Sequence, residues 1–225
     1  MIPKAGEIYT AEEIIKKLKS LSNPKNIEGM ARFGINSKNT LGVSIPDLRK
    51  IAKESGKDHA LAQKLWASGI HEARILAGMV GDPGKITPKE MDGWAKDFDS
   101  WDVCDQVCSN LFCYTPVAHK KTHEWSRKKE EYYKRSGFAL MACLAVHDKK
   151  AKDAAFMVYF PVIKRESSDE RNYVRKAVNW ALRQIGKRNP RLRKAALKTA
   201  REIYKIDSKA ARWIAADAIR ELKNK

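Results

Sequence analysis

Apolar residues recur along most of the chain with the spacing of an α-helix. In residues 174–189, VRKAVNWALRQIGKRN, they fall at i, i+3, i+4 and i+7 and so share one helical face. The residues on this face are Val174, Ala177, Val178, Ala181, Leu182 and Ile185. Trp180 lies roughly 130° from the centre of the face, near Lys176, Lys187 and Tyr173. The helix therefore holds its largest apolar side chain, that of Trp180, among cations and away from the predicted core.

The same period predicts helices over the rest of the chain, and no segment alternates apolar and polar residues as a half-buried strand does. Thr10 and Glu13 form a capping box that begins the first helix. Residues 137–146 are nearly all apolar and predict a central helix covered on every side. The predicted helices are 11–21, 24–34, 45–55, 59–69, 71–81, 87–98, 100–112, 123–129, 137–146, 151–160, 174–189, 190–205 and 208–222. The sequence predicts an all-α protein.

The predicted helices come in pairs joined by short loops, and some pairs resemble one another. Residues 181–183 (ALR) correspond to residues 218–220 (AIR), an offset of 37 residues that is typical of helical repeats. Stacked helix pairs form a curved solenoid whose concave face consists of the second helix of each pair. We therefore expect a solenoid, and a basic concave face would suit a nucleic-acid duplex.

Charge narrows the class of partner. The chain has 225 residues, enough for one extended domain or two small ones, with 45 Lys and Arg against 27 Asp and Glu. The resulting net charge of +18 exceeds what solubility requires and favours a polyanion, most simply nucleic acid. A generally basic surface without such a partner is the alternative. No apolar run could span a membrane and the N-terminus does not resemble a secretory signal, so we expect a cytoplasmic protein without membrane contact.

Candidate chemistry begins in SWDVCDQVC, residues 100–108. Trp101 and Asp105 are one helical turn apart, whereas Val103, Val107 and Leu111 point elsewhere, toward the core. A carboxylate beside an aromatic ring that excludes water has a stronger electrostatic effect. The alternative is an acidic residue that only stabilises the first turns of its helix.

Arg135, at the polar start of the apolar helix, could cap a loop, pair with Asp105 or reach a phosphate. The cysteines at 104, 108, 113 and 143 lack the paired spacing of structural zinc sites and are expected to be free, mostly buried thiols. His119 and His123 lack the glutamate of a metalloprotease motif. No phosphate-binding loop or dinucleotide fingerprint is present, so we expect no metal and no cofactor.

Several motifs together resemble the AlkD-type DNA alkylation repair family. They are NPKNIEGMARFGI, LGVSIPDLRKIAK, SWDVCDQVC, RSGFALMACLAV and NYVRKAVNWALRQIGKRNP, in the family's order over about residues 22–220. The resemblance implies a single domain over residues 1–225, a right-handed solenoid of HEAT-like repeats with a basic concave face that wraps duplex DNA. It also implies glycosylase activity on alkylated purines such as 3-methyladenine and 7-methylguanine.

The family's functional residues can be placed on this sequence. The tryptophan and aspartate of its W-D-x-x-D motif are Trp101 and Asp105, its arginine is Arg135, and its second tryptophan is Trp180. A further aromatic position, often tyrosine, is Phe33, which lacks the hydroxyl and could equally be buried.

The resemblance explains Trp180 as a residue of the DNA-binding face. Asp105 would stabilise the oxocarbenium-like transition state and position water, while Arg135 would hold a phosphate or orient Asp105. Lys176, Arg183 and Lys187 would anchor the DNA backbone. We expect a monomer that associates with the nucleoid when it binds duplex DNA containing alkylated bases. The alternatives are a non-catalytic DNA- or RNA-binding repeat protein and a protein-binding solenoid.

Overall fold

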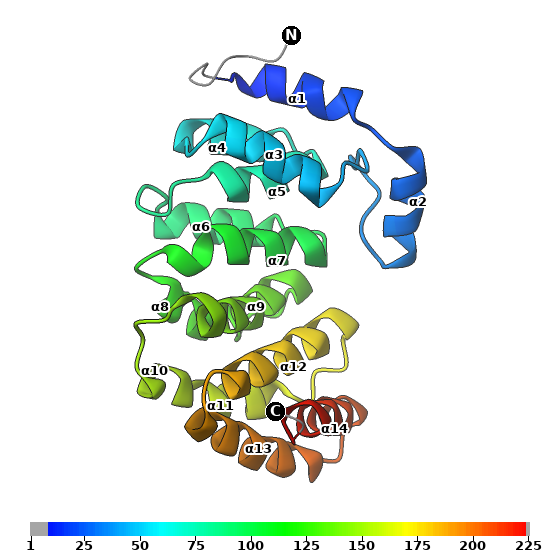
Figure 1. The fold of residues 1–225 in the computed structure, drawn as a ribbon. Coiled ribbons are helices and arrows are strands. Elements are labelled where there is room, and N and C mark those ends of the chain that lie inside the picture. The colour runs from blue at the N-terminus through cyan, green and yellow to red at the C-terminus, as the bar shows by residue number, and fades with distance from the viewer. Residues whose placement is uncertain (1–8, 224–225) are drawn as a thin grey trace. The chain divides into compact units, whose positions relative to one another are not determined.

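The computed structural model describes residues 9–223, and its regular secondary structure in this range is helical (Figure 1). The elements are α1 (Ala11–Ser20), α2 (Pro24–Arg32), α3 (Ile45–Ser55), α4 (His59–Ala67), α5 (His71–Val80), α6 (Pro88–Lys96), α7 (Trp101–Asn110), the 3₁₀ turn η1 (Phe112–Tyr114), α8 (Ala118–Trp125), α9 (Glu131–His147), α10 (Asp153–Met157), α11 (Tyr159–Glu166), α12 (Asn172–Lys187), α13 (Pro190–Tyr204) and α14 (Lys209–Lys223). The all-α prediction is confirmed. No helix within residues 9–223 is long and apolar enough to cross a membrane.

Three predicted helices differ from the observed ones by several residues or by a division. The helix expected over 137–146 is α9, which begins six residues earlier, at Glu131. The helix expected over 123–129 is α8, which begins at Ala118, because polar Lys121 and Thr122 occupy its buried face and conceal the apolar period. The helix expected over 151–160 is divided into α10 and α11. Pro161 has no N–H group and is tolerated only in the first turn of a helix, so α11 begins at Tyr159.

The chain forms two compact units, residues 1–115 and 116–225. In the first unit, α5 packs against α3, α4 and α7. The indole rings of Trp66 and Trp94 stack with centroids 4.2 Å apart, and Phe98 and Phe112 pack around them. These aromatic contacts join α4 to α6 and to η1, and α7 packs against α5 and η1.

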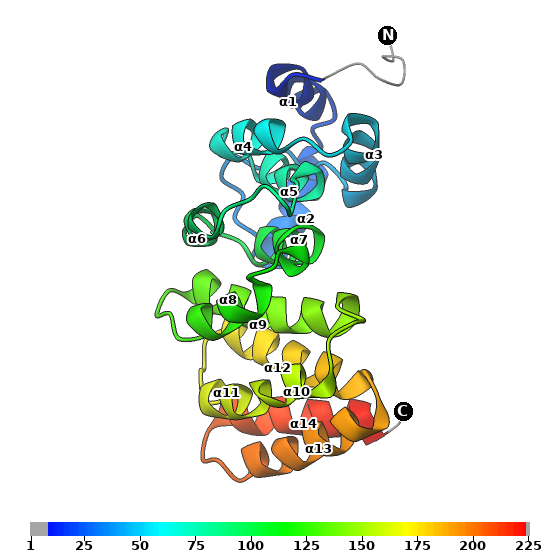
Figure 2. The same cartoon turned by 90° about the vertical axis from the view of Figure 1, so that its left-hand side faces the viewer.

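In the second unit, α12 packs against α9 on one side and α14 on the other, while α8, α11 and α13 form a second layer (Figure 2). Gly137 lets α9 approach α8 closely, since a Cβ there would lie 2.5 Å from the backbone nitrogen of Ser126. Residues 137–145 of α9 are buried as predicted, although Val146 is 38% exposed. The apolar face predicted for α12 is completely buried, and Trp180 lies partly exposed on the other side.

Candidate nucleic-acid interface

The first candidate residues lie on the exposed side of α7. Trp101 is the first residue of this helix, and Asp105 follows one turn later. Both are partly buried, whereas Val103, Val107 and Leu111 are completely buried. The predicted division of α7 into a core side and a solvent-facing border that carries the tryptophan and the carboxylate is confirmed.

A buried ion pair fixes the start of α7. The Nε2 atom of His71, on α5, lies 2.8 Å from Oδ2 of Asp102, and the Ser100 hydroxyl donates to the other carboxylate oxygen. Burial alone would lower the pKa of His71, but the hydrogen bond and charge of Asp102 outweigh it and raise this pKa. Burial would likewise raise the pKa of Asp102, yet His71 holds it below its usual value. The pair therefore anchors the turn that presents Trp101 and Asp105.

Phe33 follows α2 and is 73% exposed, so the alternative of a buried Phe33 is wrong. The indole nitrogen of Trp101 donates a hydrogen bond of 3.1 Å to the backbone oxygen of Phe33. This contact joins residues 68 positions apart, and no signal in the sequence indicates it. The hydrogen bond places the exposed residue Phe33 next to Trp101 of α7.

The loop between α2 and α3 is held by another buried acid. The carboxylate of Glu72 accepts hydrogen bonds from the backbone nitrogens of Leu41 and Gly42, at 2.9 and 2.7 Å. Gly42 has φ +77°, and a Cβ at this position would lie 2.3 Å from the backbone oxygen of Asn23. Glycine is therefore required at this position of the loop.

The second unit presents Arg135 at the start of α9. Its side chain is 5% exposed, and Nη1 donates a 2.6 Å hydrogen bond to the backbone oxygen of Tyr173 on α12. The rings of Tyr132 on α9 and Tyr173 on α12 also stack, with centroids 5.6 Å apart. Arg135 thus contacts a backbone carbonyl within α12, a role that the sequence did not suggest, and the contact aligns the first turns of α9 and α12.

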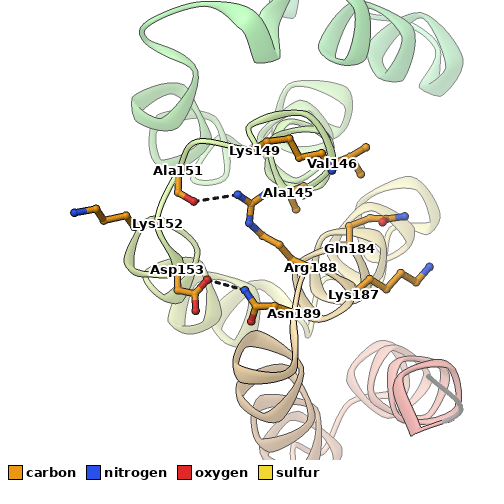
Figure 3. Close-up of a pocket in the computed structure, with 10 residues that line it drawn as sticks. All are labelled: Ala145, Val146, Lys149, Ala151, Lys152, Asp153, Gln184, Lys187, Arg188 and Asn189. Carbon is orange, nitrogen blue, oxygen red and sulfur yellow. Dashed lines mark hydrogen bonds between the residues drawn. The ribbon is translucent and has the colours of Figure 1, made fainter.

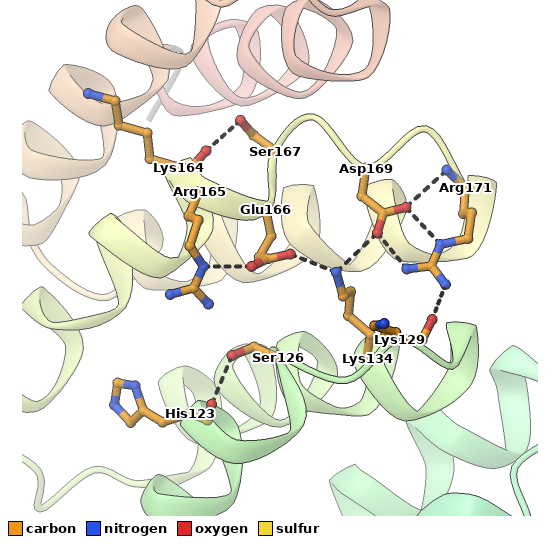
Figure 4. A network of polar contacts seen from close by, with 10 residues as sticks. All are labelled: His123, Ser126, Lys129, Lys134, Lys164, Arg165, Glu166, Ser167, Asp169 and Arg171. Carbon is orange, nitrogen blue, oxygen red and sulfur yellow. Dashed lines mark hydrogen bonds and ion pairs between the residues drawn. The ribbon is translucent and has the colours of Figure 1, made fainter.

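A charged network that the sequence analysis did not identify supports the same end of these helices (Figure 4). Lys134 bridges Glu166 at 2.7 Å and Asp169 at 3.3 Å. Arg171 binds both oxygens of Asp169 and donates to the backbone oxygen of Lys129. Burial alone would raise the pKa of Asp169, but the hydrogen bonds from Arg171 outweigh this effect. The pKa is therefore lowered below its usual value, and the carboxylate stays ionised. The loop before α12 is thereby tied to the start of α9.

The predicted DNA-binding cations of α12 differ in their surroundings. Lys176 is exposed. Arg183 forms ion pairs with Glu221 and, at 3.5 Å, with Asp217, and Lys187 pairs with Glu221. Both acids lie on α14. Arg183 and Lys187 can therefore contact a phosphate only by sharing or exchanging these carboxylate partners.

A pocket of about 500 Å³ lies where α9 and α12 end (Figure 3). Arg188 occupies its wall and donates to the backbone oxygens of Ala145, Asp148 and Ala151. Lys152 and Lys187 also line the pocket but point away from each other. Arg188 thus caps the end of α9, and the lysines do not converge on a shared anion.

The structure groups the candidate residues within each unit. Phe33, Trp101 and Asp105 lie on the first unit, where Phe33 and Trp101 are hydrogen-bonded. Arg135 and Trp180 lie on the second unit, on the adjacent helices α9 and α12. Lys176, Arg183 and Lys187 share α12 with Trp180.

Comparisons with known proteins agree with this architecture. The model of a family described as DNA alkylation repair enzyme matches residues 14–222. A solved structure of a new family of proteins related to the HEAT-like repeat DNA glycosylases, with affinity for branched DNA structures, is similar with a TM-score of 0.76. It is 19% identical in sequence, and the match covers 94% of this chain and 95% of that chain. A comparison with curated proteins gives no significant match.

The structural likeness shows that the fold is that of HEAT-like repeat proteins, as the family resemblance of the sequence implies. The family model extends from α1 to the end of α14 and so includes every candidate residue. The protein therefore belongs to the DNA alkylation repair enzyme family.

Proposed function

We propose that this protein is a DNA glycosylase that removes positively charged alkylated purines, such as 3-methyladenine and 7-methylguanine, from duplex DNA during base excision repair. The observation that carries the proposal is Asp105, a carboxylate one turn from Trp101 on the exposed side of a firmly anchored helix. A protein with a net charge of +18 that only bound DNA would gain nothing from an acid at this position.

The proposed reaction is hydrolysis of the bond between C1′ of the deoxyribose and the purine nitrogen. Alkylation has already made the base cationic, so the bonding electrons leave with the base, which becomes neutral. The sugar develops oxocarbenium character, which the carboxylate of Asp105 stabilises electrostatically. Water then adds to C1′, and its proton passes to Asp105 and on to solvent.

The remaining residues bind and orient the DNA. Trp101 and Trp180 provide electron-rich faces for the cationic nucleotide and its sugar, and Phe33 adds an exposed ring next to Trp101. Arg135 holds the start of α12 through its hydrogen bond to Tyr173, and it contributes positive charge toward a neighbouring phosphate. Lys176, Arg183 and Lys187, all on α12, contact the DNA backbone.

Substitution of Asp105 tests the chemistry. Asp105→Asn removes the charge with little change of shape, so duplex binding should persist while base release is largely lost. Asp207→Asn is a matched control, because this carboxylate is 98% exposed and lies far along the chain. Base release by Asp105→Asn at the wild-type rate would show that the carboxylate has no catalytic role. Trp180→Ala should weaken both binding and release.

A second candidate is a non-catalytic protein that binds branched DNA. The observation favouring it is the structural neighbour with a TM-score of 0.76, which is described as having affinity for branched DNA structures. This candidate predicts tighter binding to a four-way junction than to a duplex of the same sequence. It also predicts no release of free base by the wild-type protein, and Asp105→Asn should then change nothing.

A further inference from the structure

A second tryptophan in the same unit repeats the unusual placement of Trp180. The buried residues of α14 are Ala210, Ala211, Ile214, Ala215, Ala218 and Leu222. Trp213 lies roughly 140° from the centre of this face, as Trp180 lies roughly 130° from that of α12. Trp213 is 39% exposed. Two neighbouring helices thus each hold a tryptophan away from the core.

Arg175 of α12 stacks on Trp213. Its guanidinium carbon is 5.2 Å from the ring centroid, which joins α12 to α14 by a cation–π contact. The guanidinium is incompletely hydrogen-bonded. Nη2 reaches Asn172 at a long 3.4 Å, and Nε is buried without a hydrogen-bond partner among residues 9–223. The buried Nε is not accessible to a ligand, so the pair presents an aromatic plane beside a guanidinium whose Nη2 makes only the long contact to Asn172.

The charge around this pair is positive. Lys176 and Lys209 are exposed on the same two helices. Glu170, an acid before α12, has a carboxylate that accepts hydrogen bonds from Ser208 Oγ at 2.9 Å and from the backbone nitrogen of Ala210 at 3.1 Å. Glu170 therefore stabilises the start of α14, where its negative charge is already compensated by N–H and O–H donors.

We propose that Trp213 and Arg175 form a stacking platform for an unpaired nucleotide in a single-stranded segment that continues from bound DNA. Stacking needs an open face of a base, which base pairs inside a duplex do not offer, and aromatic platforms beside cations are typical of single-strand binding. The terminal Nη groups of Arg175 bind the phosphate of that nucleotide. An anionic partner without a planar group would not use the indole ring.

The separation of Trp213 from Trp180 sets the number of nucleotides between the unpaired nucleotide on the platform and the nucleotide that contacts Trp180. Packed helices are about 8–10 Å apart, which corresponds to about three nucleotides at a rise of 3.4 Å. The inference rests on the proposed function only in taking α12 as a DNA-contacting helix. It concerns binding and does not require the protein to release a base.

The test compares the affinities of two fluorescently labelled DNAs. One is a blunt duplex, and the other is the same duplex with a five-nucleotide single-stranded extension at each of its two ends. We expect the wild-type protein to bind the extended DNA roughly 5- to 150-fold more tightly, the range for stacking of one base on an aromatic side chain. Trp213→Ala should abolish most of this preference, whereas Trp213→Phe should retain it. Arg175→Gln should reduce it partially. Tyr204→Ala, which removes a 54% exposed ring from α13, is the control and should leave the preference intact.

The readout is the ratio of the two affinities, because a variant that is merely less stable would lose both equally. An equal loss for both DNAs in Trp213→Ala would overturn the proposal, as would a wild-type protein without preference for the extension. Failure of the glycosylase proposal is a separate result. It would be seen as no base release by a protein that still prefers the extended DNA through Trp213.

Discussion

Removing the charge of Glu221 should strengthen DNA binding. Its carboxylate pairs with Arg183 and Lys187, two of the residues proposed to contact the DNA backbone. The hydrogen bond from Lys187 holds the pKa of Glu221 below its usual value, so the residue is ionised at neutral pH. Glu221→Gln keeps the shape of the side chain while it removes one negative charge from the path of the DNA.

The magnitude follows from the geometry of these ion pairs. A phosphate that binds either cation would lie about 6 Å from the carboxylate, where two like charges in water repel by about 0.7 kcal/mol. Removal of this repulsion should tighten duplex binding about threefold at low salt. One additional net positive charge at the interface should also steepen the dependence of log K on log salt by about 0.9.

The assay is titration of a labelled duplex at salt concentrations between about 50 and 200 mM, a range over which phosphate-driven binding falls steeply. Glu202→Gln provides a matched control, because Glu202 pairs with Lys164 at 2.8 Å between α11 and α13, in the layer behind α12. It changes the net charge equally but leaves Arg183 and Lys187 as they are. If Glu221→Gln bound duplex no more tightly than Glu202→Gln, the α12 cations would not contact DNA.

Two further predictions concern stability. Since the pKa of His71 is raised and that of Asp102 is lowered, their pair should stabilise the protein most between the two folded-state pKa values. The free energy of unfolding should fall as pH rises through the pKa of His71 and as pH falls through that of Asp102. Chemical denaturation across pH measures this, and the His71→Gln variant should lose the decline on the alkaline side. An unchanged decline there would contradict the assignment to His71. Gly137→Ala should cost about 1–3 kcal/mol, because the added Cβ would lie 2.5 Å from Ser126 N. Gly29→Ala, with no atom within 4 Å of its Cβ, should be neutral or stabilising by up to about 1 kcal/mol, and equal melting temperatures for both glycine variants would refute the packing argument.

The local spacing of apolar residues was sufficient to predict most helices, because the buried face of each helix consists of such residues. The repeat was predictable as well. An offset of 37 residues was expected between α12 and α14, and the observed contacts of Asn179 with Asp217 and of Arg183 with Glu221 span 38 residues. The start of α8 was not predictable in this way, because Lys121 and Thr122 are polar types on its buried face.

The surroundings of the candidate residues could be predicted only in part. The exposed sides of α7 and α12 follow from helical spacing, and so do the positions of Asp105 and Trp180. The hydrogen bond between Trp101 and the backbone of Phe33 depends on how a loop returns to α7, which no local pattern specifies. The pairing of Arg183 and Lys187 with Glu221 depends on the packing of two helices and was likewise not expected.

The most direct test of the central claim is release of free base from methylated duplex DNA at low salt, with wild type and Asp105→Asn compared side by side. The account predicts that the wild-type protein releases 3-methyladenine or 7-methylguanine, and that Asp105→Asn binds the same DNA but releases almost none. Equal release by both proteins, or tight duplex binding without release by either, would contradict a glycosylase that depends on Asp105.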